Sequence, residues 1–404
     1  MSDGKHYGWV IVATMLLVQT ISSGFGFYNM SVYVAEFAEL MSRPVSDLSL
    51  AVSVFFLTGG VFGLYVANLI NRFEIRWIMV VGALICSVAL AGMSLVTKIW
   101  QVYALFMLFG LGNTGISLII ATTLITRWFP GPNRSIALSV SSSGLSLGGV
   151  TLTPLTAYLF NNMGVYESLP FLGLSFALVI IPLAIFFVRL PRPVEVVADT
   201  QSEESQLSYA QAIRSSFFCR NSIGYALCML AQVGGIAHLY GRLDIIGDYQ
   251  VASRAVASLS MASIVFRILG GWIVTRLDLR TFTLCMLVVQ AIGLTMIGLA
   301  EAAWQGIVAA AVLGASVGNL LMSQPLWLAE VFPGVIYPRV FALASALSVV
   351  GIAIGPYLLG LIIDRTGYEA AYVSAAGGCV LAWVLIYLST KGPKMELQNS
   401  SVVQ

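Results

Sequence analysis

Arg267 is the residue whose chemistry stands out most in this sequence. It lies in the middle of SLSMASIVFRILGGWIVTRLDLR, residues 258–280, which is almost wholly apolar until its end. A guanidinium stays protonated in proteins, and its planar fork of donors can bind a carboxylate through two parallel hydrogen bonds. A lone arginine in an apolar segment therefore points to an anion-binding site, provided that the surrounding elements keep the side chain away from lipid.

The composition defines those elements as membrane-spanning. Of the 404 residues, 58% are hydrophobic and only 9% are charged. Soluble domains carry about 25% charged residues, so this chain has too little charge to cover a globule in water. We conclude that the chain is an integral membrane protein.

Twelve stretches are long and apolar enough to cross a bilayer, which takes about 20 residues in a helix. They lie near 8–33, 48–70, 77–97, 100–126, 135–160, 168–188, 221–241, 252–274, 281–300, 303–328, 340–363 and 369–390. Only helices satisfy the backbone of such segments within lipid. The predicted fold is an all-α membrane protein with twelve transmembrane helices.

The charges in the loops predict the orientation. An even number of spans places both termini on one side, and 14 of the 20 Lys and Arg residues fall on that side. Five fall on the other side, namely Arg43, Lys98, Arg242, Arg254 and Arg365. Because Lys and Arg are enriched in cytoplasmic loops, we expect both termini in the cytoplasm and the chain in the cell (inner) membrane.

The chain divides into two similar halves. The stretch 189–216 is rich in Pro, Glu and Ser at its start and reads as a linker, with a short surface helix from about Ser208. NRFEIR (71–76) recurs as TRLDLR (275–280), and WFPGPNRSIAL (128–138) has a counterpart in VFPGVIYPRVFAL (331–343). We predict two pseudo-symmetric six-helix bundles, at 1–188 and 219–390. A cytoplasmic linker at 189–218 joins them, and a cytoplasmic tail follows at 391–404. Such repeats are typical of secondary transporters with a midplane site.

At this point the sequence resembles the major facilitator superfamily of transporters. The family's loop motif G-x-x-x-D-R-x-G-R has altered forms at 67–76 and 271–280, in which Asn71 and Thr275 replace the acid. GLIIDRTG (360–367) is a related stretch after the eleventh span. The resemblance implies a gating role, in which loops clasp helix ends, for Asn71, Arg72, Arg76, Arg276, Asp278, Arg280, Asp364 and Arg365.

Two further stretches resemble the branch of monocarboxylate porters and oxalate/formate exchangers. DGKHYGWVIV (3–12) is similar to the entry into the first span of monocarboxylate porters. RWFPGPNRSIALSVSSSGLSLGG (127–149) is similar to their signature at the fifth span, which the exchangers largely share. Both groups have a substrate-binding arginine on the eighth span, and the resemblance implies that role for Arg267.

Helical geometry supports that role. Arg267 lies about 20 Å along the helix from outer-facing Arg254 and about 13 Å from inner-facing Arg276, so it is deep in the membrane. Ser260 and Ser263 share its face, whereas the large apolar residues Phe266, Leu269, Trp272 and Ile273 lie largely elsewhere. No Asp or Glu was identified in the hydrophobic centre of any span. A substrate carboxylate is the expected partner; the alternatives are a structural role and snorkelling to the headgroups.

The sequence departs from the resembled porters at positions used for coupling. Where many of them have an Asp one turn before the arginine, this chain has Ser263, and no lysine follows Lys5 on the first span. His238, near the outer end of the seventh span, is then the intramembrane candidate for carrying a proton. A packing or interfacial role is the alternative for His238. The eleventh span has no second cation, which makes a dicarboxylate less suitable.

Several amides and a phenol are further candidates for substrate contact. Each can hydrogen-bond a carboxylate or hydroxyl oxygen, or equally satisfy a neighbouring helix. Together with Ser263, they are Tyr28, Asn29, Asn113, Gln232, Asn319 and Gln324.

We therefore predict a secondary transporter of a small monocarboxylate such as lactate or pyruvate, by alternating access and proton-coupled symport. The alternatives are an anion antiporter of the oxalate/formate type, a carrier of a larger or aromatic carboxylate, and a sensor or scaffold without transport. No phosphate loop, paired catalytic carboxylates or metal cluster is evident, so we expect no enzyme activity, cofactor or metal site. The expected partners are an organic anion, a proton and the lipid bilayer, with no nucleic acid and the chain as a monomer.

Overall fold

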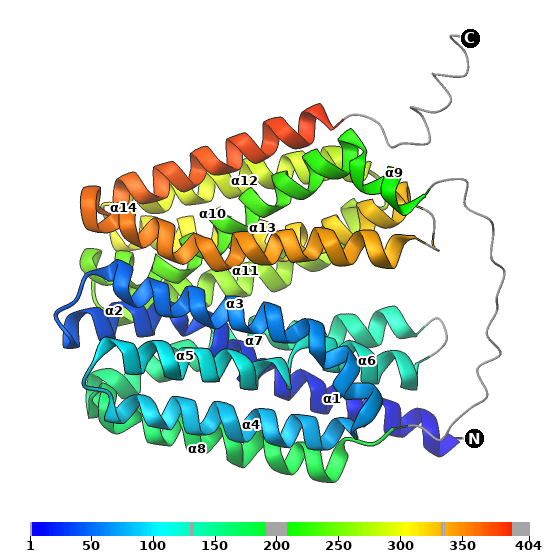
Figure 1. Cartoon of the computed structure of the whole chain (residues 1–404). Helices are drawn as coiled ribbons and strands as arrows, with labels where there is room; N and C mark the ends of the chain where they lie inside the picture. Colours follow the sequence, from blue (N-terminus) through cyan, green and yellow to red (C-terminus); the bar gives the residue numbers. More distant parts are fainter. Residues whose placement is uncertain (1, 130–132, 191–207, 333, 335, 390–404) are drawn as a thin grey trace.

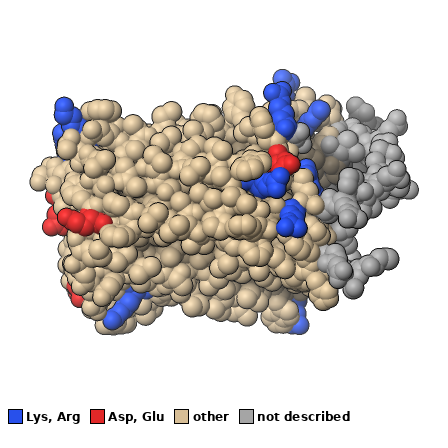
Figure 2. Space-filling model, turned by 90° about the horizontal axis from the view of Figure 1, so that it is seen from below, with Lys and Arg blue, Asp and Glu red and all other residues tan. Residues whose placement is uncertain are grey.

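The structure is a computed structural model that describes residues 2–129, 133–190, 208–332, 334 and 336–389. Its long helices run side by side along one direction (Figure 1). The face at which α1 begins and α14 ends is called the terminal face here, and the other end is called the opposite face. Large apolar side chains such as Leu178, Ile268 and Trp304 are exposed around the molecule, whereas Lys, Arg, Asp and Glu gather at its two ends (Figure 2). An apolar belt between two charged ends is the surface that a bilayer requires.

Six spans form the N-terminal half. Two of them are interrupted: the first by η1 and the fourth by a turn at Gly115–Ser117. In chain order the elements are α1 (Ser2–Ser23), η1 (Gly24–Tyr28), α2 (Met30–Leu40), α3 (Val45–Arg72), α4 (Ile75–Gly92), η2 (Met93–Leu95), α5 (Ile99–Thr114), α6 (Leu118–Trp128), α7 (Arg134–Met163), α8 (Val165–Pro182) and η3 (Leu183–Phe187).

Six further spans form the C-terminal half, preceded by the short helix that the sequence predicted near Ser208. The elements are α9 (Tyr209–Arg214), α10 (Ser216–Ile246), α11 (Tyr249–Ile273), α12 (Leu279–Gly298), α13 (Ala303–Val331) and α14 (Tyr337–Leu388).

The last element, α14, holds two spans. Eleven helical segments of the described residues are long and apolar enough to cross a membrane, and α14, with 52 residues, is by far the longest. At Gly367 φ is 87° and ψ is 174°, a conformation that glycine adopts readily, and the chain reverses there (Figure 1). The twelve predicted spans are thus confirmed, with the eleventh and twelfth joined directly.

The first span is longer than predicted. It continues past Asn29 through α2 to Leu40 and so includes Glu36 and Glu39. The prediction missed this because two carboxylates lower the apolar score of MSVYVAEFAEL. Glu36 instead lies at the interface between the halves, where the Tyr240 hydroxyl of α10 donates a 3.4 Å hydrogen bond to it.

The two halves lie one above the other in Figure 1 and meet along three pairs of helices. These pairs are α3 with α14, α7 with α11, and α2 with α10. In each pair, one member comes from each half. The arrangement places α11 and its Arg267 at the interface between the halves.

Candidate functional site

A seam of small residues joins α7 to α11 between the halves. Moving forward along α7, the residues that it contacts on α11 move backward by the same number of positions, so the two helices are antiparallel. The Ser146 hydroxyl lies 3.5 Å from the Ser263 hydroxyl. A Cβ on Gly149 would overlap the Ser260 hydroxyl. Through these contacts the small-residue stretch of the fifth span, residues 139–149, packs closely against α11.

Arg267 lies at the end of this seam that points toward the terminal face. Its Nη1 donates to the backbone carbonyl of Ser142 on α7, at 3.5 Å, so the guanidinium reaches across to the other half. The next α7 residue on this line, Ser139, is exposed, whereas Ser260 and Ser263 are buried. The seam therefore opens near Arg267, toward the terminal face.

The environment of the guanidinium contains no carboxylate in the described part of the protein. The ion pairs found there, Arg43 with Asp47 and Arg76 with Glu74, do not involve Arg267. Its Nε is buried without a hydrogen-bond acceptor. An unmatched, buried donor on a partly buried cation is costly, so the site is chemically suited to an anion from outside the protein.

The lipid-facing side of α11 is separate from this site. Phe266, Ile268 and Leu269 are 43%, 71% and 46% exposed, whereas Ser260 and Ser263 are fully buried. The predicted division of this helix into a small polar face and a large apolar face is confirmed. Arg267 lies with the small polar residues, over α13 and beside α7, which does not fit a side chain snorkelling to the headgroups.

Tyr28 lies next to the seam in a π-helical turn. In η1 the Asn29 amide donates to the Gly24 carbonyl at 2.9 Å, which adds a residue to the turn. Such turns occur frequently at functional sites. The ring is buried against Gly149, beside the Ser260 hydroxyl of the seam.

Asn113 of α5 is a polar residue of the N-terminal half that, unlike Tyr28, is only partly buried. The Ser22 hydroxyl donates a 2.6 Å hydrogen bond to its side-chain oxygen. This bond orients the amide and leaves its NH2 group as a donor for another acceptor.

The other amides predicted for substrate contact are buried between helices. Asn29 donates to the Thr156 hydroxyl at 2.7 Å, and Ser348 donates to Gln324 at 3.1 Å. Asn319 donates to the carbonyls of Phe266 and Ala315 at 3.0 and 2.9 Å, which ties α13 to α11. Gln232 is 1% exposed, and its oxygen has no partner. The geometry of these residues is typical of helix packing.

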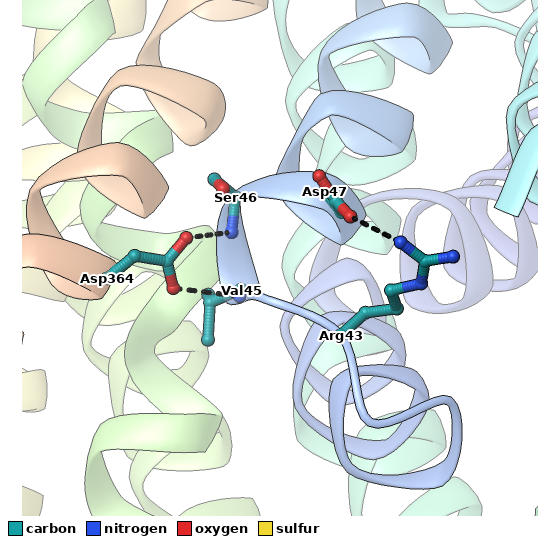
Figure 3. Close-up of polar contacts among 5 residues, drawn as sticks. All are labelled: Arg43, Val45, Ser46, Asp47 and Asp364. Atoms are coloured by element: carbon teal, nitrogen blue, oxygen red, sulfur yellow. Dashed lines mark hydrogen bonds and ion pairs between the residues drawn. The ribbon is translucent and has the colours of Figure 1, made fainter.

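Asp364 closes the opposite face by capping a helix of the other half. Its two carboxylate oxygens each accept a 2.9 Å hydrogen bond from the backbone amides of Val45 and Ser46, at the start of α3 (Figure 3). The residue before them, Pro44, provides no side-chain cap. First-turn amides of a helix lack intrahelical acceptors and attract anions, so Asp364 supplies what α3 lacks.

His238 lies nearby in the same interface and is 1% exposed. Its Nε2 is 2.9 Å from the Pro356 carbonyl, which can only accept, so Nε2 carries the proton. The Ser49 hydroxyl of α3 lies 3.5 Å from the same nitrogen, and Nδ1 is buried without a partner. This geometry serves packing between α10, α14 and α3 at the closed face.

At the terminal face, the described hydrogen bonds stay within each half. Arg76 pairs with Glu74, and the Arg276 guanidinium lies 4.1 Å from the centroid of the Trp272 ring. Arg280 donates to the Tyr387 carbonyl at 2.6 Å. Arg72 is exposed at this face. Arg365 is also exposed, but at the opposite face. The side chain of Asn71 lies outside the described residues.

Asp278 acts as the N-cap of α12 at this face. Its carboxylate accepts a 2.9 Å hydrogen bond from the Thr281 amide. That hydrogen bond favours the charged form and lowers the pKa of the Asp278 carboxyl below its usual value. Asp278 therefore holds the start of its own helix.

Comparison with known proteins places the chain in a class of carriers. The profile of the Major Facilitator Superfamily matches residues 15–246 and 240–403, so the chain belongs to this superfamily. It is a multi-pass membrane transporter and not an enzyme. The predicted resemblance to this superfamily is confirmed.

Individual relatives are distant. The chain is 24% identical to monocarboxylate transporter 13 of Rattus norvegicus over 93% of its own length and 87% of that protein. It is 23% identical to the uncharacterized MFS-type transporter YcxA of Bacillus subtilis (strain 168), covering 63% of this chain and 62% of that protein. A bacterial homolog of the human lysosomal transporter Spinster, solved in an inward-facing and occupied conformation, has the same fold, with a TM-score of 0.73, 16% identity and coverage of 95% and 97%.

Sequence reasoning missed the Ser142 carbonyl and Gly318, which contact Arg267 from two other helices. A backbone oxygen has no signature in a sequence, and a glycine in GASVG (314–318) signals close packing without naming its neighbour.

Proposed function

We propose that this transporter carries a small monocarboxylate and that Arg267 binds its carboxylate group. The observation that carries the proposal is the guanidinium itself: it lies at the interface between the halves, near the end of the seam that opens to the terminal face, with a buried Nε that has no acceptor. A carboxylate would accept two hydrogen bonds from it and neutralise its charge. The similarity to a protein named as a monocarboxylate transporter supports the same substrate class.

The proposed coupling is proton symport. One cation binding one carboxylate gives a neutral site, whereas the empty carrier keeps the positive charge of the arginine, so the anion alone would move net charge across the membrane. A proton entering with each anion would keep net transport electroneutral. The charge distribution of the loops supports a cytoplasmic terminal face in the cell membrane. We propose in addition that the chain acts as a monomer.

In this proposal the structure represents the inward-facing form of the carrier. Apart from the bond from Arg267 to Ser142, the hydrogen bonds that join the halves in the described residues lie between the middle of the molecule and the opposite face. Rocking about the α7–α11 seam would separate Asp364 from α3 and expose Arg267 to the other side.

The test is uptake of labelled acetate, lactate, pyruvate and benzoate into proteoliposomes, with and without a proton gradient. We expect Arg267→Gln to abolish uptake of the transported acid, while Arg254→Gln, an exposed arginine on the same helix, retains it. Uptake by Arg267→Gln at the wild-type rate would refute the anchor role.

A counterflow measurement distinguishes symport from the antiport alternative. Symport predicts that a pH gradient alone drives accumulation into empty vesicles. Uptake that occurs only with an organic anion trapped inside, and that ignores the pH gradient, would instead establish an anion exchanger. Transport of benzoate in preference to lactate would establish a carrier of larger acids.

A further inference from the structure

Gly318 of α13 lies directly beneath the Arg267 guanidinium. A Cβ built on Gly318 would lie 2.6 Å from Nε and 3.1 Å from Nη2 of Arg267. Carbon and nitrogen atoms that are not bonded to each other do not approach to 2.6 Å without repulsion, since their optimal separation is about 3.5 Å or more. In the present structure the guanidinium therefore occupies space that any other residue at position 318 would fill.

The packing of α13 against α11 has its own determinants on either side of Gly318. One turn earlier, a Cβ on Gly314 would overlap the backbone carbonyl of Leu259. At the next position, Asn319 donates to the Phe266 carbonyl at 3.0 Å and packs on Gly270. Gly314 and Asn319 thus bring the two backbones together, whereas the atom nearest to a Cβ on Gly318 is Nε of Arg267, and the Ser263 carbonyl of α11 lies at 3.1 Å, as far as Nη2.

We propose that Gly318 is a positioning residue that sets how far the Arg267 guanidinium projects from α13, and thereby the space left for the transported acid. The proposal rests on the proposed function, because it concerns the same anion site. The flat guanidinium lies against the bare backbone of Gly318 on one side, and its Nη1 reaches the Ser142 carbonyl on the other. These two contacts fix its place between the halves.

The direction of the effect follows from these contacts. A methyl group at position 318 forces the guanidinium away from α13 and toward α7, since α13 blocks movement the other way. The shift lengthens its hydrogen bonds to a carboxylate held by other groups and removes volume from the site. Larger acids therefore lose more than small ones, and selectivity moves toward the shortest carboxylates.

The test compares three glycine-to-alanine variants of the full chain in proteoliposomes. Gly318→Ala meets the arginine at 2.6 Å and the α11 backbone only at 3.1 Å, Gly314→Ala overlaps the α11 backbone, and Gly271→Ala meets nothing within 4 Å. We expect Gly318→Ala to raise the KM for the transported acid about tenfold, the size expected when one charge-assisted hydrogen bond is weakened, with Vmax within about twofold of wild type. Acetate uptake should fall less than uptake of a larger acid.

The controls separate positioning from packing. Gly314→Ala should lower Vmax or the amount of folded protein without moving KM, and Gly271→Ala should behave as wild type. A KM for Gly318→Ala that equals the wild-type value, or that moves only as it does in Gly314→Ala, overturns the proposal. If Gly318→Ala does not fold, Arg267→Lys, which keeps the charge but has no guanidinium for Gly318 to place, decides: a KM equal to that of wild type overturns the proposal.

Failure of this proposal is distinguishable from failure of the proposed function. If Arg267→Gln transports at the wild-type rate, the anchor role is lost together with the present proposal. If Arg267→Gln abolishes uptake and Gly318→Ala leaves KM and selectivity unchanged, Arg267 remains the anchor and Gly318 has no part in placing it.

Discussion

Replacing Asp364 by Asn should open the opposite face of the molecule. The substitution removes the charge and one of the two acceptors that the Asp364 carboxylate presents to the Val45 and Ser46 amides. Loss of a helix cap costs about 0.5–2 kcal/mol, and loss of a negative charge at a helix N-terminus about 0.3–1 kcal/mol. Because Asp364 is exposed, we take about 1–2 kcal/mol in total. This shifts the ratio of closed to open forms about 5- to 30-fold.

The shift can be measured as a distance between spin labels on the two halves. Lys98 and Glu301 are exposed and follow helices that end at the opposite face, one in each half. Cysteines at these positions carry the labels, after the exposed Cys219 and Cys285 have been replaced by serine. In wild type we expect a predominantly short distance, and in Asp364→Asn a second, longer distance with increased population.

Arg365→Gln is the matched control, because Arg365 is the adjacent exposed charge and its side chain has no hydrogen bond among the described residues. It should leave the distance distribution as in wild type. A distribution in Asp364→Asn that is indistinguishable from wild type would refute the argument that this cap holds the halves together.

Three further predictions concern other contacts of the interface and the terminal face. Gly149→Ala should slow uptake, because its Cβ would overlap the Ser260 hydroxyl most closely and would also meet Tyr28. Ser260→Ala removes the closest of these contacts and should restore part of the uptake in the double variant; no restoration would exclude the overlap with the hydroxyl as the cause. His238→Gln should keep proton-driven uptake, since an amide NH2 can replace Nε2 as donor to the Pro356 carbonyl. If the variant still exchanges anions but no longer responds to a proton gradient, His238 is the proton carrier. Asp278→Asn should lower the free energy of unfolding by about 0.3–1 kcal/mol, because Asn can still cap the helix but lacks the negative charge that a helix N-terminus favours. Because the Asp278 pKa is lowered in the folded state, the difference in stability between wild type and Asp278→Asn should be complete above pH of about 4 and should disappear as pH falls through the folded pKa. A stability difference that persists at low pH would contradict the capping role.

Apolar periodicity was sufficient to predict the twelve spans and the buried face of α11, since both depend on local sequence alone. It placed Ser260 and Ser263 correctly because residues three or four apart share a helix face. It failed at Glu36, where packing against Tyr240 of the other half allows a carboxylate within the first span.

The partners of Arg267 and Asp364 could not be predicted in the same way. Arg267 contacts a carbonyl 125 positions away, and Asp364 contacts an amide 319 positions away. Both partners are backbone atoms, so no side-chain pattern identifies them. Contacts between halves depend on how the bundles meet, and the sequence of one helix does not contain that information.

The tight turn at Gly367 has a mechanical consequence. Since the two spans of α14 are joined without a loop, the first cannot tilt unless the second tilts with it. The second span contacts α10 through the bond from the Tyr372 hydroxyl to the Gly235 carbonyl, at 2.7 Å. A displacement of Asp364 at the start of α3 is therefore transmitted through the first span of α14 to the second, and from there to α10.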